Sequence, residues 1–253
     1  MGSDEIRRGS HVMFLKSCRL KREEVQDFSV YPFSIPTIHH LDTLSLNQTV
    51  TFFVGENGSG KSTLLEAIAD QIGFHTAGGS RQNVRAYNVH ASESHLGDYL
   101  RLSWMPKVTD GFFLRAETFY QFASHIDEVD EDGFKSYGGK SLHHQSHGES
   151  FLSLFQHRFR EKAIYLLDEH EAALSPAKQL TLLRILHDLE KEQNVQFIIA
   201  THSPILLGYP NAKIYEFDET IHEVAYEETS HVQISTYFLR NREKMLEELF
   251  KEE

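Results

Sequence analysis

The sequence predicts an α/β protein in which a mixed sheet is flanked by helices. Short, continuous apolar segments, typical of buried strands, alternate with longer segments whose apolar residues recur at helical spacing. In addition, the first of these strands runs into a glycine-rich turn that is followed at once by a helix. The buried strands are expected over residues 50–54, 111–116, 163–167 and 195–200.

Two helices are expected to follow strands directly. The segment 62–72 carries apolar residues at helical spacing after the glycine-rich turn. A second helix is expected to run to about residue 192, because Ser175 is a good N-cap and Pro176 suits the first helical position. Between the first helix and the strand 163–167, residues 73–101 are polar and residues 130–148 are rich in Gly, His and Ser, so both are typical of loops. Residues 119–129 and 149–159 have helical spacing. We therefore expect 73–159 to form a helical insertion in the sheet protein, apart from the strand at 111–116.

The C-terminal part predicts a hairpin over 212–217 and 221–226, followed by an amphipathic helix over 235–252. The charged side of that helix is expected in solvent. Its apolar stripe is expected to pack inward, with a partner-binding surface as the alternative, and consists of Met245, Leu246, Leu249 and Phe250.

The length of 253 residues allows one large domain or two small ones, at about 150 residues per domain. Residues 1–12 resemble the remnant of an expression tag, so the native chain is expected to start at Met13. A single domain is therefore expected over 13–253.

Composition excludes several classes of protein. The net charge of −12 disfavours a general nucleic-acid coat protein or a membrane-surface binder, both of which need a basic excess. The only cysteine, Cys18, rules out an intramolecular disulfide framework and fits a reducing compartment. No apolar segment approaches the roughly 18 residues of a membrane span, and no secretory signal is visible. We therefore expect a cytoplasmic protein without direct membrane insertion.

The strongest motif is the octapeptide 55–62, which matches G-x-x-x-x-G-K-[ST] in full between a buried strand and a helix. Glycines let such a loop curl so that its backbone N–H groups converge on phosphate oxygens, at the positive end of the following helix. Lys61 is expected to bridge the β- and γ-phosphates, and the Ser62 hydroxyl to coordinate Mg²⁺. The expected nucleotide-binding residues here are Gly55, Asn57, Gly58, Ser59, Gly60, Lys61, Ser62 and Thr63.

A second motif is the pair of acids that ends the apolar strand 163–167. Asp168 is held at a fixed height in the sheet, which suits a second Mg²⁺ contact, and Glu169 can deprotonate an attacking water. An apolar strand ending in two acids is common by itself. It is the phosphate-binding loop upstream that makes a functional interpretation the better one.

Two weaker motifs complete the set. Ser146 and Gly148 lie at an expected loop-to-helix junction, where they can form another phosphate cradle, although a serine there is usually only a cap. His202 follows the strand 195–200 and can reach a γ-phosphate or a water, although a lone histidine is more often structural.

In this order, the four motifs resemble those of the ABC-type ATPase domain, over roughly residues 13–217. The residues within the motifs are most similar to those of compact, stand-alone bacterial ATPases of the SMC and RecF-like branch. The resemblance implies MgATP as the ligand, Glu169 as catalytic base, His202 as switch histidine and Lys61 as a catalytic phosphate ligand. It also implies an ATP-dependent head-to-tail homodimer, in which Ser146 and Gly148 contact the γ-phosphate bound to the other copy.

The chain departs from the family pattern at several positions. The signature segment 145–149 differs from L-S-G-G-Q at three of five positions, and His147 replaces a glycine. His170 lies where Pro commonly follows the catalytic glutamate. The glutamine that usually ends the strand after the first helix is replaced by Glu117, a candidate holder of a metal-bound water, with Gln121 as the alternative. No adenine-stacking aromatic is assigned, and the candidates are Tyr31 and Phe33.

The expected function is that of a nucleotide-gated homodimeric switch that hydrolyses ATP slowly, because dimer opening gates the cycle. A role in DNA maintenance or defence, with a partner such as a nuclease, is the leading hypothesis, since the motifs are SMC-like but the 82 residues between Thr63 and Ser146 are too few for a coiled-coil arm. The alternatives are the motor subunit of an ABC transporter and a nucleotide-sensing scaffold with negligible hydrolysis. Whether nucleic acid is bound stays open.

Overall fold

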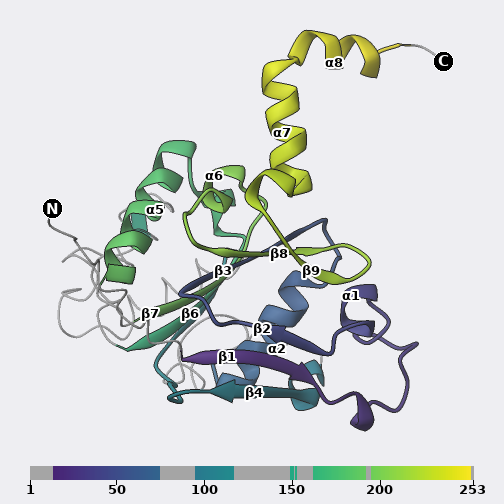
Figure 1. The fold of residues 1–253 in the computed structure, drawn as a ribbon, viewed down its shortest axis with the longest axis vertical. Coiled ribbons are helices and arrows are strands. Elements are labelled where there is room, and N and C mark those ends of the chain that lie inside the picture. Colours follow the sequence, from purple (N-terminus) through teal and green to yellow (C-terminus); the bar gives the residue numbers. More distant parts are fainter. Residues whose placement is uncertain are drawn as a thin grey trace, which may run out of the picture.

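The fold is built on two sheets that pack around one helix, α2 (Lys61–Ile72) (Figure 1). The computed structural model describes residues 14–74, 95–116, 149–150, 152, 162–191 and 195–251. Within these residues, a six-stranded sheet and a three-stranded sheet enclose one hydrophobic core, and a helix on the far side of the larger sheet covers a second. This confirms the predicted α/β class with a mixed sheet.

The larger sheet has the strand order β5-β6-β7-β3-β8-β9. The first five strands in this order are parallel to their neighbours, and only the hairpin β8-β9 is antiparallel. All four expected buried strands and the expected hairpin are present. Their bounds are β3 Val50–Gly55, β5 Gly111–Arg115, β6 Ala163–Asp168, β7 Val195–Ala200, β8 Lys213–Phe217 and β9 Ile221–Val224.

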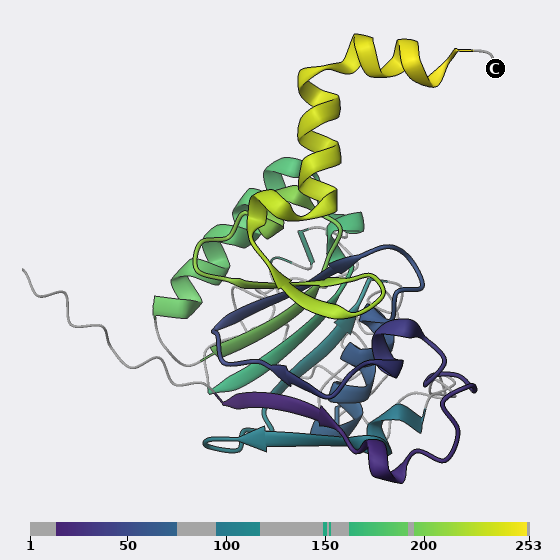
Figure 2. The same ribbon diagram turned by 45° about the vertical axis from the view of Figure 1, so that its right-hand side comes forward.

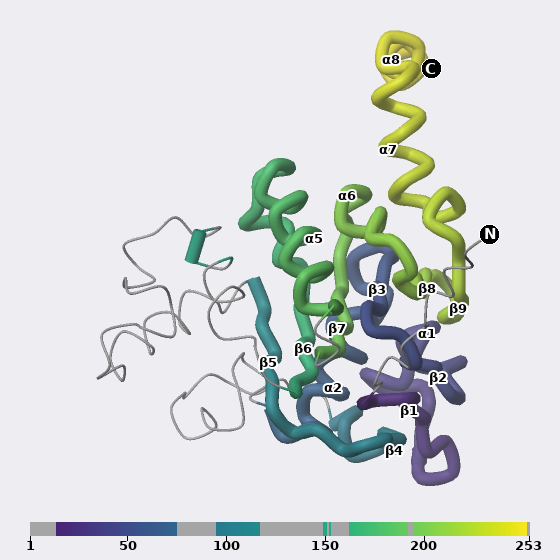
Figure 3. Tube along the Cα trace, turned by 60° about the vertical axis from the view of Figure 1, so that its left-hand side comes forward, coloured from purple at the N-terminus to yellow at the C-terminus, as the bar shows by residue number. Residues whose placement is uncertain are grey.

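The sheet is buried on both faces because its central strands are apolar at every position. In β3, Phe52 packs against the core on the side of α5 (Pro176–Lys191), whereas Phe53 packs on the side of α2 (Lys61–Ile72). Figure 3 shows the same arrangement, with α5 and α2 on opposite faces of the sheet. The two long helices thus follow the sequence expectation closely, including the cap of α5 by the Ser175 hydroxyl, 3.4 Å from the backbone nitrogen of Lys178.

The smaller sheet was not expected from the sequence. Its antiparallel strands are β1 (Leu15–Leu20), β2 (Thr43–Ser45) and β4 (Leu100–Trp104), in the order β2-β1-β4. Strand β4 lies inside the range 73–159, so that range is not a continuous helical insertion. The strand β4 was not predicted because the range 73–159 is polar around it. In β4, Leu100 is buried and its polar neighbours face solvent, and this period-two pattern becomes clear only from the pairing with β1.

A buried glutamine joins the two sheets. Gln196, the second residue of β7, accepts a hydrogen bond from the backbone nitrogen of Leu15 at 2.8 Å and donates to the carbonyl oxygens of Leu15 and Leu46 at 2.8 and 2.7 Å. These backbone groups would otherwise be buried without partners between the sheets. The remaining short helices are α1 Pro36–His39 and α6 Pro204–Leu207, with the 3₁₀ helices η1 Arg22–Glu24, η3 His95–Tyr99, η6 His170–Ala173 and η7 Tyr226–Glu228.

The predicted single helix over 235–252 is instead two helices, α7 (Ser230–Arg240) and α8 (Arg242–Leu249). The break lies at Asn241, whose backbone leaves the helical region at φ −130°, ψ 33° and whose side-chain amide donates to the carbonyl oxygen of Tyr237 at 3.1 Å. Asparagine competes with helical backbone bonds in this way, which explains the interruption.

The two C-terminal helices extend away from the sheets (Figures 1 and 2). For this reason the expected inward packing of the apolar stripe is wrong at its end, where Leu249 is 63% and Phe250 74% exposed, while Met245 and Leu246 are half-buried. Among the described residues, no helix is long and apolar enough to cross a membrane.

Candidate functional site

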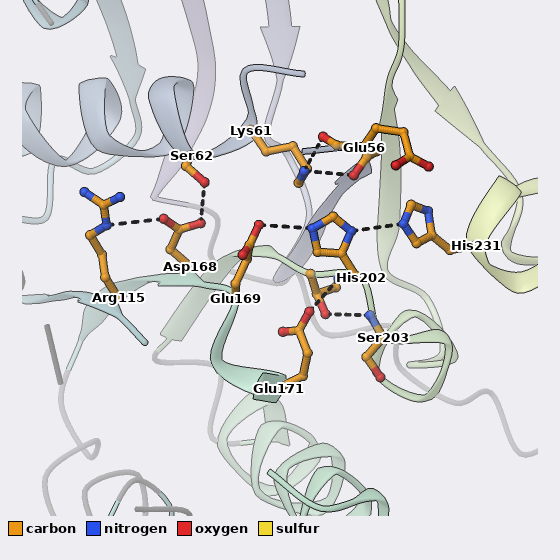
Figure 4. A network of polar contacts seen from close by, with 12 residues as sticks. Glu56, Lys61, Ser62, Arg115, Asp168, Glu169, Glu171, His202, Ser203 and His231 are labelled. Carbon is orange, nitrogen blue, oxygen red and sulfur yellow. Dashed lines mark hydrogen bonds and ion pairs between the residues drawn. The ribbon is translucent and has the colours of Figure 1, made fainter. Parts of the chain in front are cut away.

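The site lies at the carboxyl ends of the adjacent strands β6, β7 and β3, in that spatial order. Parallel neighbours end at the same edge of a sheet, so the loops that follow them converge, as is general for ligand sites in open α/β sheets. The loop after β3, the two acids at the end of β6 and the histidine after β7 therefore meet (Figure 4). In the sequence, the outermost of these residues, Gly55 and His202, are 147 positions apart.

The loop after β3 depends on glycine at three positions. Gly55, Gly58 and Gly60 have φ angles of 148°, 82° and 97°. A Cβ on Gly55 would lie 2.3 Å from the carbonyl oxygen of Phe217, and one on Gly60 would lie 2.7 Å from the Thr37 hydroxyl. A Cβ on Gly58 would meet no atom within 4 Å, so Gly58 is needed for its left-handed backbone alone.

Lys61 begins α2 and turns back over the loop. Its side chain is buried, and its ammonium donates to the carbonyl oxygens of Gly55 at 2.8 Å and Glu56 at 2.9 Å. Burial lowers the pKa of Lys61, and the carboxylates of Glu169 and Asp168 oppose this shift. A buried ammonium whose partners are uncharged carbonyl groups is well suited to exchange them for phosphate oxygens.

Ser62 and Asp168 approach one another at the start of α2 and the end of β6. The Ser62 hydroxyl donates to Oδ1 of Asp168 at 2.9 Å, and Oδ2 lies 3.5 Å from Nε of Arg115. Burial raises the pKa of Asp168 to about 6, although the hydrogen bond from Ser62 and the Arg115 guanidinium act in the opposite direction. A hydroxyl and a buried carboxylate with incompletely compensated charge are the oxygen donors that Mg²⁺ prefers, so these residues fit the ion.

Glu169 is the first residue beyond β6 and adopts a left-handed backbone at φ 53°, ψ 37°. Such a conformation is uncommon for a residue with a side chain, and it costs on the order of 1 kcal/mol. Its backbone nitrogen donates to the carbonyl oxygen of Ala200 at 3.0 Å, while its carboxylate lies 3.0 Å from Nε2 of His202. The strained turn thus directs a 40% exposed carboxylate into the site beside the buried Asp168.

His202 is held on three sides. Its backbone nitrogen donates to the carboxylate of Glu171 at 2.5 Å, and its ring nitrogens contact Glu169 and His231 (Figure 4). The neighbouring His170 is fully buried in η6, and burial lowers its pKa to about 3. His170 is therefore a neutral core residue rather than a titrating group of the site.

Three residues around the site were not predicted: Arg115, Glu171 and His231. Arg115 pairs with Asp168 through strand register, since the two are opposite one another in β5 and β6. Glu171 and His231 belong to a 3₁₀ helix and to α7. No motif spacing marks any of them, because each reaches the site through tertiary contacts.

The other predicted site residues divide into two groups. Asn57 is exposed on the loop and Thr63 is half-buried in the first turn of α2. Phe33 is packed 4.9 Å from the ring of Tyr99 and is buried, which excludes it from stacking on a base, whereas Tyr31 is 61% exposed. The residues that lie outside the described part of the chain are Glu117, Gln121, Ser146, His147 and Gly148.

Comparison with known proteins identifies the class. The family described as an AAA domain matches residues 28–252, so the chain belongs to this family. Together with the order of the motifs, this confirms an ABC-type P-loop ATPase, an enzyme that binds and hydrolyses ATP.

Individual similarities are distant. A probable ATP-dependent transporter of Antithamnion sp. is 26% identical over 62% of this chain and 71% of its own length. A Staphylococcus aureus protein assigned as the ATP-binding protein of an ABC transporter is 27% identical over 69% of this chain, which spans only 34% of that relative.

Among solved structures, the SMC head domain from Thermotoga maritima has 16% identity, a TM-score of 0.48 and coverage of 84% of this chain and 98% of its own. CbiO1 from Clostridium perfringens, part of an ABC transporter complex, has 18% identity, a TM-score of 0.48 and coverage of 82% and 91%.

Proposed function

We propose that the protein binds MgATP on the loop 55–62 and uses its hydrolysis to gate a homodimer. The observation that carries this proposal is the convergence of Lys61, Ser62, Asp168 and Glu169 at the ends of adjacent parallel strands. A phosphate ligand, two Mg²⁺ ligands and a candidate base are thereby within one site.

The substrate phosphates are held by the chain as follows. Backbone N–H groups of the loop and the first turn of α2 point at the phosphate oxygens, and Lys61 exchanges its carbonyl partners for the β- and γ-phosphates. Ser62 and Asp168 hold Mg²⁺, which neutralises charge on the β- and γ-phosphates. Arg115 keeps the Asp168 carboxylate in place from the opposite side.

Glu169 is the proposed general base. Its partly exposed carboxylate is close enough to solvent to take a proton from the attacking water, while its hydrogen bond with His202 restricts its orientation. A hydrogen bond from His202 to the γ-phosphate would require its Nε2–H to exchange Glu169 for a phosphate oxygen when the site closes. Closure is proposed to come from a second copy, whose Ser146 and Gly148 complete the site in a head-to-tail dimer.

The substitution Glu169→Gln tests this assignment. The variant is expected to bind ATP normally but to lose about 10²- to 10⁴-fold in steady-state phosphate release, and to accumulate as an ATP-dependent dimer in light scattering. Lys61→Ala is expected to lose ATP binding, and therefore the dimer as well.

The matched control is Glu219→Gln, which changes an exposed glutamate in the turn between β8 and β9 and should hydrolyse ATP at the wild-type rate. Wild-type turnover in Glu169→Gln would show that Glu169 is not the base. Undetectable turnover in the wild type itself would instead support the nucleotide-sensing scaffold.

The wider role is proposed as a switch for DNA maintenance or defence that acts on an effector such as a nuclease. The alternative, a transporter motor, is favoured by the names of the curated relatives, which describe transporter ATP-binding proteins. Purification of Glu169→Gln in the presence of ATP discriminates the two, because a soluble nuclease would accompany a switch and a detergent-extracted membrane subunit would accompany a motor.

A further inference from the structure

A second histidine contacts the switch histidine from the C-terminal helices. Nδ1 of His202 lies 3.0 Å from Nε2 of His231, and the two rings are 5.0 Å apart between centroids at an angle of 43°. His231 is the second residue of α7 and lies 29 positions after His202 in the chain. Figure 4 shows His202 between the Glu169 carboxylate and the His231 ring.

The contact with Glu169 sets the orientation of the His202 ring. An ionised carboxylate only accepts hydrogen bonds, so Nε2 of His202 carries the hydrogen that faces Glu169. The hydrogen bond between Nδ1 of His202 and Nε2 of His231 needs one further hydrogen, which a ring nitrogen of either residue can carry. Burial and the neighbouring His202 lower the pKa of His231.

The first turn of α7, which carries His231, is bonded to the larger sheet through Ser230. The backbone nitrogen and the hydroxyl of Ser230 both donate to the carboxylate of Glu216 in β8, at 3.1 and 2.5 Å. The Ser230 hydroxyl also lies 3.3 Å from Nδ1 of His231. The start of α7 is thus tied to the sheet at the point where His231 reaches the site.

We propose that His231 is a positioning residue for ATP hydrolysis, whose hydrogen bond with Nδ1 of His202 holds that ring with its Nε2–H toward Glu169. The inference rests on the proposed roles of Glu169 and His202. It also makes α7 part of the site, because any displacement of the first turn of this helix removes the hydrogen-bond partner of His202.

Two substitutions separate this role from simple packing. His231→Leu removes the hydrogen-bond partner of Nδ1, whereas His231→Gln retains an amide group that can donate or accept and so can replace it. The leucine variant is expected to lose on the order of tenfold or more in kcat with KM for ATP changed less than about twofold, since misorientation acts on the chemical step. The glutamine variant is expected to recover kcat to within about threefold of the wild type. His222→Leu is the control, because His222 is an exposed histidine on β9 whose ring lies 3.7 Å from the exposed Asp218.

A spectroscopic measurement tests the same inference without turnover. In ¹⁵N spectra of the histidine side chains, His202 of the wild type should show a protonated Nε2 and an Nδ1 that takes part in a hydrogen bond. In His231→Leu the Nδ1 signal should shift toward that of a free imidazole, and in His231→Gln it should not.

The outcomes are distinct. Wild-type kcat in His231→Leu, or an unchanged His202 spectrum, would overturn the inference, as would a glutamine variant that is folded and as slow as the leucine variant. If Glu169→Gln turns over at the wild-type rate, the proposed function fails instead, whereas the spectrum still reports whether His231 is bonded to Nδ1 of His202.

Discussion

Single residues at the site carry charge in places where water is excluded. Asp168 is 5% exposed and lies 3.5 Å from the Arg115 guanidinium, whereas Lys61 is 3% exposed and donates to uncharged carbonyl groups. Their pKa values move in the directions that burial dictates, upward for the carboxyl and downward for the ammonium. The folded protein therefore holds a site that its ligands would stabilise, since phosphates offset Lys61 and a cation offsets Asp168.

The pKa of Asp168 yields a prediction on stability. Its folded value of about 6 lies above its ordinary value of 3.8, so its favourable contribution is fully present below pH 3.8 and is lost as pH rises through 6. In the absence of Mg²⁺ and nucleotide, Asp168→Asn should therefore gain stability relative to the wild type between pH 5 and pH 8, by about 1–2 kcal/mol. Urea denaturation at the two pH values measures this.

The exposed Asp42, paired loosely with Arg19 at 3.9 Å, offers the control. Asp42→Asn should show the same difference from the wild type at both pH values. A pH-independent effect of Asp168→Asn would contradict the assignment of a raised pKa to this carboxyl.

At the scale of elements, the site depends on how strands are joined across the two sheets. The loop 55–60 is supported from behind by α1, where the Thr37 hydroxyl donates to the carbonyl oxygen of Ser59 at 2.5 Å. Strand β7, which carries His202 at its end, is attached to the smaller sheet by Gln196. The smaller sheet thus contributes no catalytic group, but it fixes the elements that do.

Gln196→Leu should be strongly destabilising. The change leaves a backbone N–H and two carbonyl groups of Leu15 and Leu46 buried without their partner, at about 1–3 kcal/mol each. We expect a loss of at least about 3 kcal/mol in the free energy of unfolding, measured by chemical denaturation.

Gln233→Leu is the comparison, because this glutamine is exposed on α7 and donates to the carbonyl oxygen of Glu227 at 3.2 Å. Its effect should remain within about 0.5 kcal/mol. Equal losses in the two variants would show that Gln196 does not join the sheets.

At the scale of the whole molecule, charge and shape bear on partners. A net charge of −12 opposes binding to a polyanion, so DNA binding by the single chain is expected to be weak. Fluorescence anisotropy with duplex DNA, at several salt concentrations and with or without ATP, measures this. Tight binding without ATP and with a steep salt dependence would reveal a local basic surface that the total charge hides.

Much of the fold could be predicted because its strongest elements are locally encoded. Continuous apolar strands, the helix after the glycine loop and the cap at Ser175 depend on neighbouring residues only, and all of them are present. The smaller sheet was missed because β1 and β4 are half-polar strands, whose identity comes from their pairing. The two-helix C-terminus was missed because the break is set by one residue, Asn241.

By itself, the sequence determined the phosphate-binding loop, the two acids after β6 and the histidine after β7, because each is a short motif attached to the end of a buried strand. Only the tertiary structure decided that Arg115 faces Asp168, that Glu171 and His231 hold His202, and that α7 enters the site. These contacts join residues from elements whose strand register and helix direction are settled by packing, and packing leaves no local pattern in the chain.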